Sequence, residues 1–451
     1  MRPGCARRVL LAGGGLLLLG VLAAAAYAWR VVRTLDTPSF RTSLLARAKE
    51  TVGAEVRAKK MDIALLSGVT LEGLEVANPA PFAGNLLTAD AFVLRYRLLP
   101  LLTGRIEVER LAFAKPVLSL VMDARGAFNY ERLGGASPRT PPAAAASAVP
   151  FRISLRRLSV ADASIVMTDP ARSRLLAVEH LDFRSSFEIV DGIARGSGEA
   201  NAATVNLGGT LFLRSLRTPL VASKESVRLS PVRGRLAGGE ATGNVTVRLR
   251  GGFRYMADLE VKGAEVKTLL AEAQSAAGLS GSLRAKARFE GSGGLATVRG
   301  RGDGRVEGCR VQDARTLGLL AEVLKVPELA NPDLEECRFE FVQSGRSLST
   351  PVVSLTGRAL RLTGRGTVNL ATGALDYDMR LALAPKLLAK VTRPELRSAF
   401  AKQEDGFSAI DFRLSGTTRE PKTDLLARVG RAAAGEAVKG QLEKLFGKKQ
   451  P

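Results

Sequence analysis

The sequence is poor in the residues from which most enzymes build a reactive site. It contains one histidine, His180, and three cysteines, Cys5, Cys309 and Cys337. Metal centres and nucleophilic triads need several imidazoles, or one histidine placed beside a nucleophile, and the sequence offers no recognisable motif of either kind. His180 falls on a polar position of an expected strand, which predicts a surface side chain. We therefore expect a protein that is not an enzyme and has no catalytic residue, no metal and no cofactor.

Other patterns resemble known sites without completing one. The glycine runs near 291–294 and 300–304 lack the third glycine of a dinucleotide-binding fingerprint, and no glycine–lysine pair closes a phosphate loop. Asp376 and Asp378 suit an acid–base pair or a metal, but no third ligand is near, so a solvated strand face explains them better. The spacing of Cys309 and Cys337 allows a disulfide without establishing one.

Aromatic residues are also scarce, with five tyrosines and one tryptophan, whereas 66 lysines and arginines face 44 acidic residues and leave a net charge of +22. The basic residues are spread along the chain and few rings can stack on bases, so we expect no nucleic-acid partner. Such a diffuse positive charge suits binding to a membrane surface rich in anionic lipid. The alternative is that the charge only keeps the protein soluble.

One long uncharged run, residues 9–29, stands near the start of the chain. As a helix it is long enough to cross the hydrocarbon core of a bilayer. A signal peptide cleaved after Ala28 is the alternative, but the length of the run and its Trp29–Arg30 end favour an uncleaved anchor. We expect residues 1–8 to stay in the cytoplasm and the body to be exported, because long domains are translocated largely regardless of their charge.

A repeated apolar spacing organises the rest of the chain, in which one apolar residue is followed by others two, five and seven places later. Two-residue steps are the period of a strand with one apolar face, and the three-residue step needs an extra residue, most simply in a β-bulge, to keep all four on that face. The copies are Val69, Leu71, Leu74, Val76; Ile106, Val108, Leu111, Phe113; Ile153, Leu155, Leu158, Val160; Leu176, Val178, Leu181, Phe183; and, more loosely, Leu87, Ala89, Phe92, Leu94.

Charged residues such as Glu72, Glu107 and Arg156 lie between the apolar ones, as expected for a solvated opposite face. The strongest internal match sets RIEVERLAF, from Arg105, against RISLRRLSV, from Arg152. Such repetition predicts an elongated array of similar units, which has no compact active-site pocket by default.

The fold class expected is mainly β with a few short helices, in which an N-terminal transmembrane helix precedes an elongated antiparallel β-sheet. Glycine pairs such as Gly208–Gly209 predict the hairpin turns. Helices are expected within 39–60, 264–277, 316–326, 385–402 and 424–446. The predicted divisions are a tail at 1–8, an anchor at 9–29, a β region at 30–133, a proline- and alanine-rich linker or loop at 134–150, a repetitive β body at 151–422, and an amphipathic helix with a basic tail at 423–451.

The order of several motifs is similar to that of the AsmA-like family. The resemblance is carried by LSGVTLEGLEVANPAPF, by Leu-Pro-Leu-Leu-x-Gly at Leu99–Gly104 and by Gly-x-x-Asn-aromatic at Gly126–Tyr130. In the carboxy-terminal half it continues in KTLLAEAQSAAGLSGSLRAKARFEGSGG and LTGRGTVNLATGALDYDMRLAL. The resemblance implies an inner-membrane protein of a diderm envelope whose open, twisted sheet curls into a trough, apolar inside and wet outside.

The resemblance further implies a bridge-like lipid-transfer protein with its body in the periplasm, supporting outer-membrane biogenesis or homeostasis. Membrane phospholipids would be its partners. Binding of other envelope proteins is a further alternative that the sequence does not decide. The expected groove residues are Val69, Leu71, Leu74, Val76, Phe92, Leu94, Ile106, Val108, Leu111, Phe113, Ile153, Leu155, Leu158, Val160, Val178, Leu181 and Phe183. The alternative is a non-enzymatic structural or assembly factor of the cell envelope, in which the apolar stripe is the core of a sandwich.

Overall fold

The computed structural model describes residues 49–50, 52–64, 68–97, 100, 105–124, 127–133, 152–169, 174–190, 193–223, 225–248, 254–292, 297–311 and 315–446. The predicted tail at 1–8, anchor at 9–29 and linker at 134–150 lie outside these residues. Within them, no helix is both long and apolar enough to cross a membrane.

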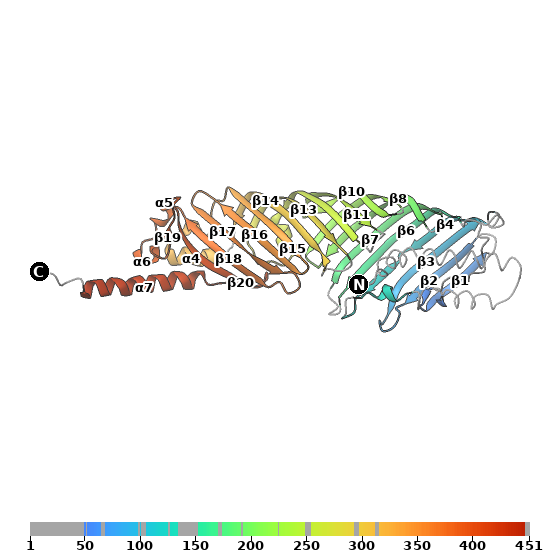
Figure 1. Cartoon of the computed structure of the whole chain (residues 1–451), viewed down its shortest axis with the longest axis horizontal. Coiled ribbons are helices and arrows are strands. Elements are labelled where there is room, and N and C mark those ends of the chain that lie inside the picture. Colours follow the sequence, from blue (N-terminus) through green and yellow to red (C-terminus); the bar gives the residue numbers. More distant parts are fainter. Residues whose placement is uncertain are drawn as a thin grey trace. The chain divides into compact units, whose positions relative to one another are not determined.

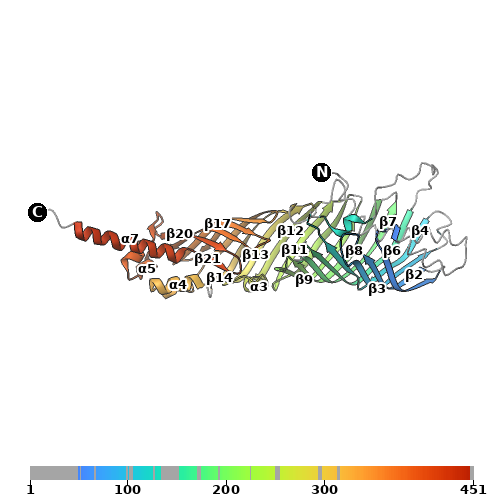
Figure 2. The same cartoon turned by 90° about the horizontal axis from the view of Figure 1, so that it is seen from below.

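The protein is mainly β, as predicted, and the described residues contain 21 strands and a few helices, most of them short. The chain divides into two compact units. The amino-terminal unit extends through Arg235 and adds Thr242–Ala257 and Ser292–Gly294, and the carboxy-terminal unit is formed by Leu236–Ala241, Asp258–Gly291 and Leu295–Pro451. In each unit the strands form a twisted and curled sheet (Figures 1 and 2).

The first strands follow one another closely along the chain. They are β1 (Val56–Ala64), β2 (Gly68–Ala77), β3 (Asn85–Arg97), β4 (Arg105–Ala114), β5 (Val117–Val121), β6 (Arg152–Thr168), β7 (Arg174–Val190), β8 (Ile193–Leu207), β9 (Leu211–Ala222), β10 (Ser226–Leu236) and β11 (Gly239–Arg248). Antiparallel pairing joins β1 to β4 in order and then β6 to β9 in order. The turn predicted at Gly208–Gly209 is present, and both glycines have a positive φ.

The prediction of a wholly antiparallel sheet is wrong at β6, which pairs in parallel with both β4 and β5. The sheet is therefore mixed. A parallel pair needs a crossover that returns the chain to the same end of the sheet, which a tight turn cannot provide. The segment between Val121 and Arg152 supplies this crossover, and it contains the bridge of Met122 with Phe128 and then the 3₁₀-helix η2 (Asn129–Arg132).

The two copies of the strongest internal match lie side by side in this parallel pair. Arg105 is opposite Arg152, Val108 opposite Leu155, and Leu111 opposite Leu158. The ladder continues past the break between β4 and β5, because Lys115 N donates to Ala161 O and Ser164 N donates to Pro116 O, each at 2.8 Å. Equivalent positions of the repeat therefore share one face of the sheet.

The crossover is attached to the sheet through Asn129, which is fully buried. Its Nδ2 donates to Asn78 Oδ1 and to Ser119 O, both at 2.7 Å. Its Oδ1 accepts from Val121 N at 3.1 Å and from Tyr130 N at 3.0 Å. The Gly-x-x-Asn-aromatic element thus has a structural role, since one amide side chain joins β5, η2 and the turn after β2.

The later strands continue the order of neighbours. They are β12 (Arg254–Glu265), β13 (Leu279–Gly291), β14 (Arg299–Val311), β15 (Glu336–Ser344), β16 (Ser347–Thr356), β17 (Leu360–Asn369), β18 (Leu375–Leu383), β19 (Ala401–Lys402), β20 (Ser408–Gly416) and β21 (Pro421–Thr423). Antiparallel pairing joins β13 to β18 in order, β18 then pairs with β20, and β20 also pairs with β19 and β21.

Helices cover part of this sheet's apolar face in the carboxy-terminal unit. They are α3 (Val266–Glu272), α4 (Arg315–Leu324), η4 (Pro327–Leu329), α5 (Pro385–Leu388), α6 (Pro394–Arg397) and α7 (Leu425–Phe446). Helix α7 matches the predicted 424–446 closely. The helix expected over 385–402 is reduced to α5 and α6, because the chain turns between them and α6 begins at Pro394, where the missing N–H favours a new first turn.

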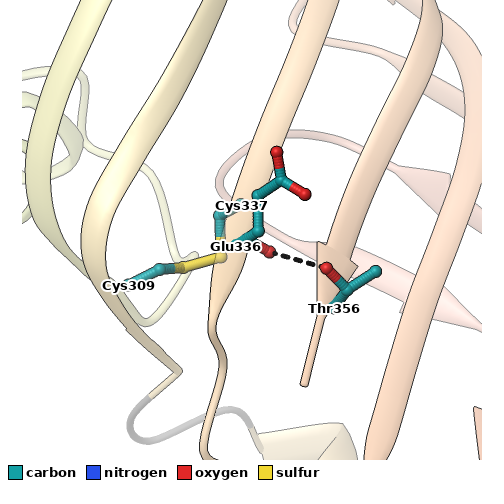
Figure 3. Close-up of a disulfide and its surroundings, with 4 residues drawn as sticks. All are labelled: Cys309, Glu336, Cys337 and Thr356. Atoms are coloured by element: carbon teal, nitrogen blue, oxygen red, sulfur yellow. Dashed lines mark hydrogen bonds between the residues drawn. A yellow bond between two sulfur atoms is a disulfide. The ribbon is translucent and has the colours of Figure 1, made fainter. Parts of the chain in front are cut away.

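A disulfide between Cys309 on β14 and Cys337 on β15 closes the segment that contains α4 and η4 (Figure 3). The cysteines are 28 residues apart in sequence, and their Cα atoms are 6.1 Å apart. Both are buried in the core of the unit. Beside them Thr356 Oγ1 donates to Glu336 O at 3.4 Å, and Glu336 pairs with Thr356 in the ladder. The bridge that the sequence left open is therefore formed.

Candidate functional site

The four apolar residues of β2 share one buried face, as their spacing predicts. Val69, Leu71, Leu74 and Val76 are all buried. The three-residue step is taken at Gly73, whose φ of +61° suits glycine because it has no Cβ. The predicted β-bulge is not what keeps the face constant here. Strand β3 takes the same step opposite, with Leu71 facing Phe92 and Leu74 facing Ala89, so the register does not shift.

In β4 and β6 the predicted β-bulge is present at the three-residue step, because the register of β4 shifts against β3 between Arg95 and Tyr96 and that of β6 shifts against β7 between Leu155 and Leu158. Val108, Leu111 and Leu158 are buried, with Val108 only 1% exposed. Together with Leu94 of β3 they form a cluster against which Phe92, Phe113, Leu155 and Val160 pack while remaining half-buried. The rings of Phe92 and Phe113 have centroids 5.0 Å apart at an angle of 57°. We call the shared surface of these residues on β2, β3, β4 and β6, together with Phe183 of β7, the apolar face.

Not all predicted groove residues belong to this face in the same way. Phe183 of β7 packs against the cluster, whereas Val178 and Leu181 are half-buried and pair with Ile165 and Ala163 farther along β6. Val76 packs with Val52 and Ala54 in a separate small cluster. Ile106 and Ile153 are opposite each other in the ladder, but their side chains lie outside the described residues.

The sequence interpretation missed the contribution of β1. Val56, Ala58, Met61 and Ile63 have the same two-, five- and seven-residue spacing, and all four pack in the cluster formed with Val69, Leu71 and Leu74. The spacing in the sequence is therefore the signal from which these β1 residues could have been predicted to lie on the apolar face. Tyr96 and Phe187 also pack at the cluster of β4 and β6, and burial raises the pKa of Tyr96.

The opposite face of these strands is charged and its charges are largely paired. Glu107 accepts from Arg156 at 3.3 Å and lies 3.9 Å from Arg97. Lys60 and Glu72 are 3.3 Å apart. Arg156 and Arg157 are exposed at the three-residue step of β6, where the polar face gains a residue. The strands are therefore apolar on one side and ionic on the other, as their alternation requires.

The titratable residues considered from the sequence lie on solvated faces. His180 is exposed, with its Nδ1 2.6 Å from Asp162 Oδ1. Asp376 accepts from Arg413 Nη2 at 2.7 Å, and Asp378 is exposed beside it on β18. Within the described part of the chain, no three histidine, cysteine or acidic side chains gather in a way that could hold a metal ion.

The apolar face of the carboxy-terminal unit differs because its own helices fill part of it. Leu320 and Leu324 of α4, Leu387 of α5 and Leu425 of α7 pack against Leu381 of β18 in one core. Phe289 of β13 and Phe341 of β15 do not belong to this core; they are half-buried and their ring centroids lie 6.1 Å apart. The apolar surface thus passes from a filled core to a more open strand face within this unit.

Among the described residues, the two main clusters offer apolar contact over several strands and include no acidic, basic or thiol side chain. In the amino-terminal unit all side chains of the two main clusters come from strands, whereas Val76 at the end of this face packs with the helical residue Val52. Burying apolar area from water yields about 25 cal/mol per Å², or about 0.8 kcal/mol per methylene group. Such a surface can hold an apolar chain without any chemical step.

Residues 6–199 match the model of the AsmA family. This confirms the resemblance read from the amino-terminal motifs, and it covers strands β1 to β7 and most of the apolar face. No curated protein and no solved structure matches the chain.

Proposed function

We propose, from the match of the amino-terminal residues to the AsmA family, that this protein transfers lipid in a diderm cell envelope. Residues 9–29 anchor it in the inner membrane, and the body lies in the periplasm. Acyl chains of phospholipids move along the apolar face while their head groups stay in water. This transfer supports outer-membrane biogenesis or homeostasis and needs no catalytic residue.

The observation that carries the proposal is the half-buried part of the apolar face. Phe92, Phe113 and Phe183 pack on a buried aliphatic layer and retain exposed surface, although they are large apolar side chains. Contiguous exposed apolar surface on a soluble body marks a site for a partner or ligand. An acyl chain is the ligand that would cover it without needing hydrogen bonds.

The disulfide supports the proposed compartment. Disulfide bonds persist in oxidising environments such as the periplasm and are rare in the cytosol. The bond between Cys309 and Cys337 is formed inside the core of the carboxy-terminal unit. A body that folds after export acquires such a bond readily.

A structural or assembly role without lipid conduction is the second candidate. The packing of the carboxy-terminal unit favours it, because Leu320, Leu387 and Leu425 from three helices fill the apolar face there. A face filled by its own chain has no room for cargo. Under this reading the whole apolar stripe is a protein core.

Lipid crosslinking tests the proposal. A photo-reactive residue at Phe113 in the membrane-inserted protein is expected to capture phospholipid in cells. Val160→Asp places a charge at a half-buried position of the apolar face and is expected to abolish capture. Ala161→Asp is the matched control, because Ala161 is the next residue of β6 and is exposed. Val108 is less suitable, since an unpaired charge at a site this buried is expected to unfold the unit.

Both variants are first checked for an unchanged thermal unfolding temperature. Failure to capture lipid at Phe113 in the wild type would contradict lipid transfer and favour the structural role. Equal capture by folded Val160→Asp would show that the apolar face is not the route.

A further inference from the structure

A line of skipped strand pairings crosses the amino-terminal unit. Between β1 and β2 the pairing omits Lys59 and Gly73, and between β2 and β3 it omits Gly73 and Asp90. Between β3 and the break that separates β4 from β5, the omitted residues include Asp90 and Lys115. Each skipped position therefore adjoins the one on the strand before it.

The line continues through the later strands. The parallel pairing with β6 omits Lys115 and Asp162, and the pairing of β6 with β7 is irregular where Asp162 meets His180. Strands β7 and β8 omit His180 and Ala203, and β8 and β9 omit Ala203 and Ser215. We call these aligned residues the seam: Lys59, Gly73, Asp90, Lys115, Asp162, His180, Ala203 and Ser215.

Five seam residues have a left-handed backbone. The φ angle is +61° at Gly73, +45° at Lys115, +55° at Asp162, +51° at His180 and +53° at Ser215. Four of them are not glycine, and this conformation is unfavourable for a residue with a Cβ. Such strain persists where the surrounding structure imposes it, and it is concentrated at sites that bind or switch. Its alignment over successive strands indicates one feature of the sheet and not a set of separate irregularities.

The seam divides the apolar side of these strands into two walls that pack differently. All residues of the cluster formed around Leu94, Val108, Leu111 and Leu158 lie on one side of the seam, which we call the first wall. On the other side, from β5 to β7, half-buried side chains pair from strand to strand but belong to none of the four clusters of the described residues. We call them the second wall: Leu118, Leu120, Ile165, Met167, Leu176 and Val178.

The two sides of the seam share a core only at its beginning. Leu71 and Leu74 lie on either side of Gly73 and pack in one cluster with Met61 and Ala89. From β5 to β7 the described residues form no such common cluster, so buried packing does not fix the second wall to the first. We therefore expect the sheet to be rigid at β1 to β3 and to bend more easily farther along the seam.

The contacts on the polar face follow the seam and do not cross it. Asp90 and Lys115 approach within 3.9 Å, and His180 Nδ1 lies 2.6 Å from Asp162 Oδ1. Backbone hydrogen bonds also continue from strand to strand, as from Lys115 N to Ala161 O at 2.8 Å. Because each contact joins neighbouring strands at the seam itself, the sheet stays continuous while neither wall is tied to the other.

We propose that the amino-terminal unit flexes along the seam, and that the second wall closes on an acyl chain held against the first wall. At the seam the polar side gains a residue, so the sheet curls toward its apolar side. A few residues that absorb a change in φ and ψ are sufficient for a hinge between regular elements. An acyl chain between two walls buries more apolar surface than a chain on one wall. The ligand rests on the proposed lipid transfer, whereas the flexion does not depend on it.

Distances between spin labels, measured by double electron–electron resonance, test the flexion. The crossing pair, Arg174→Cys with Arg184→Cys, spans the seam on β7 over about 33 Å of strand. The same-wall pair, Arg195→Cys with Arg217→Cys, is the control and spans about 20 Å, because Arg217 is opposite Asn201 on β8. All four arginines are exposed.

The full chain carries Cys5→Ser, while Cys309 and Cys337 form a disulfide and take no label. It is stripped of lipid in an amphipathic polymer and measured before and after addition of phosphatidylethanolamine and phosphatidylglycerol vesicles. Without lipid, we expect the distance distribution of the crossing pair to be at least twofold wider than that of the same-wall pair. Lipid should narrow it and shift it to shorter distances, and should leave the same-wall pair unchanged.

A seam that only curls the sheet permanently is the alternative, and it predicts equally narrow distributions for both pairs. That result would overturn the proposal, and so would a crossing distribution that lipid leaves unchanged while a photo-reactive residue at Phe113 captures lipid. Failure of capture at Phe113 is the separate result that contradicts lipid transfer. A wide crossing distribution in the lipid-free protein would still support the flexion in that case.

Discussion

Asn129 joins three segments of the amino-terminal unit through four hydrogen bonds of a single amide group. The side chain of Asn129 has no exposure, so its amide group is satisfied by these protein partners and not by bulk water. The amide is the only common side chain with this combination of donors and acceptors in one plane. An asparagine in the Gly-x-x-Asn-aromatic element is thus explained by packing and not by catalysis.

Asn129→Ala is expected to lower the free energy of unfolding by about 3 kcal/mol, because the half-buried partners Asn78 and Val121 lose their hydrogen bonds to a fully buried amide. Asn129→Asp should cost more, since a carboxylate cannot donate to Ser119 O. Chemical unfolding followed by fluorescence or circular dichroism measures both effects. Asn244→Ala serves as the control, because Asn244 is exposed and accepts one bond from Ser230. A similar loss in the control would contradict this account.

The ion pair of Arg380 and Asp411 gives a pH-dependent prediction. The hydrogen bond from Arg380 lowers the pKa of Asp411 in the folded protein. A lowered carboxyl pKa contributes stability above the unfolded pKa of about 3.9, and this contribution is lost as the pH falls through the folded value. Since both side chains are more than half exposed, the contribution is small, of order 0.5 kcal/mol.

Asp411→Asn is therefore expected to be slightly less stable than the wild type at pH 7, and the difference should shrink as the pH falls below the unfolded pKa of about 3.9. Thermal unfolding across this pH range provides the measurement. Asp378→Asn is the comparison, because Asp378 is exposed and forms no ion pair in the described part of the chain. A difference between Asp411→Asn and the wild type that stays constant as the pH falls from 7 to 2 would refute the assignment.

At the scale of elements, the segment of α4 and η4 is held at both of its ends. The disulfide joins β14 to β15, and Leu320, Leu324 and Leu329 bury the segment in the core. Cross-linking residues 28 apart removes conformational freedom mainly from the unfolded chain. The bond therefore stabilises the whole carboxy-terminal unit and not only its own loop.

Replacing both Cys309 and Cys337 by serine is expected to destabilise the carboxy-terminal unit by about 3–4 kcal/mol. Reduction of the unfolded wild-type protein should reproduce the effect. Differential scanning calorimetry under oxidising and reducing conditions measures the unfolding transition of the carboxy-terminal unit. A lower transition temperature of the whole unit distinguishes this loss of stability from a change confined to the loop. An unchanged transition in the double variant would show that burial alone holds the segment.

Much of the apolar face could be predicted from the sequence, because side-chain direction along a strand depends only on local geometry. The spacing of Val69, Leu71 and Leu74 therefore identified a shared face, even though Gly73 and not a bulge produces it. The direction of β6 could not be predicted in this way. Whether Val108 meets Leu155 in a parallel or antiparallel pair depends on where a distant crossover returns the chain.

The filled core of the carboxy-terminal unit also could not be predicted from local sequence patterns. The helical patterns of 316–326 and 424–446 are visible in the sequence, but nothing in them specifies the strands that they cover. Leu320 and Leu425 meet Leu381 only because the chain folds back over β18 and β20. The groove prediction consequently stopped at Phe183, and the half-buried rings of Phe289 and Phe341 were missed.

For the whole molecule, the proposed topology is directly testable. A reporter that is active only in the periplasm, fused after Lys60, is expected to be active, because residues 9–29 should insert with residues 1–8 in the cytoplasm. A reporter that is active only in the cytoplasm, fused at the same site, is the control and should be silent. The reverse pattern would remove the envelope role together with the proposed route for lipid.

The order in which the strands pair has a kinetic consequence. From β1 to β4, and again from β6 to β9, each strand pairs with the one just before it, so the contact order of these segments is low. Hairpins of this kind close within about 1–10 μs, and each offers an edge to the next. The junction of β4 with β6 instead requires closure of a long loop, whose entropy must be lost before any contact compensates for it. The two series of hairpins should therefore form first, and the parallel junction should limit the folding rate of the amino-terminal unit.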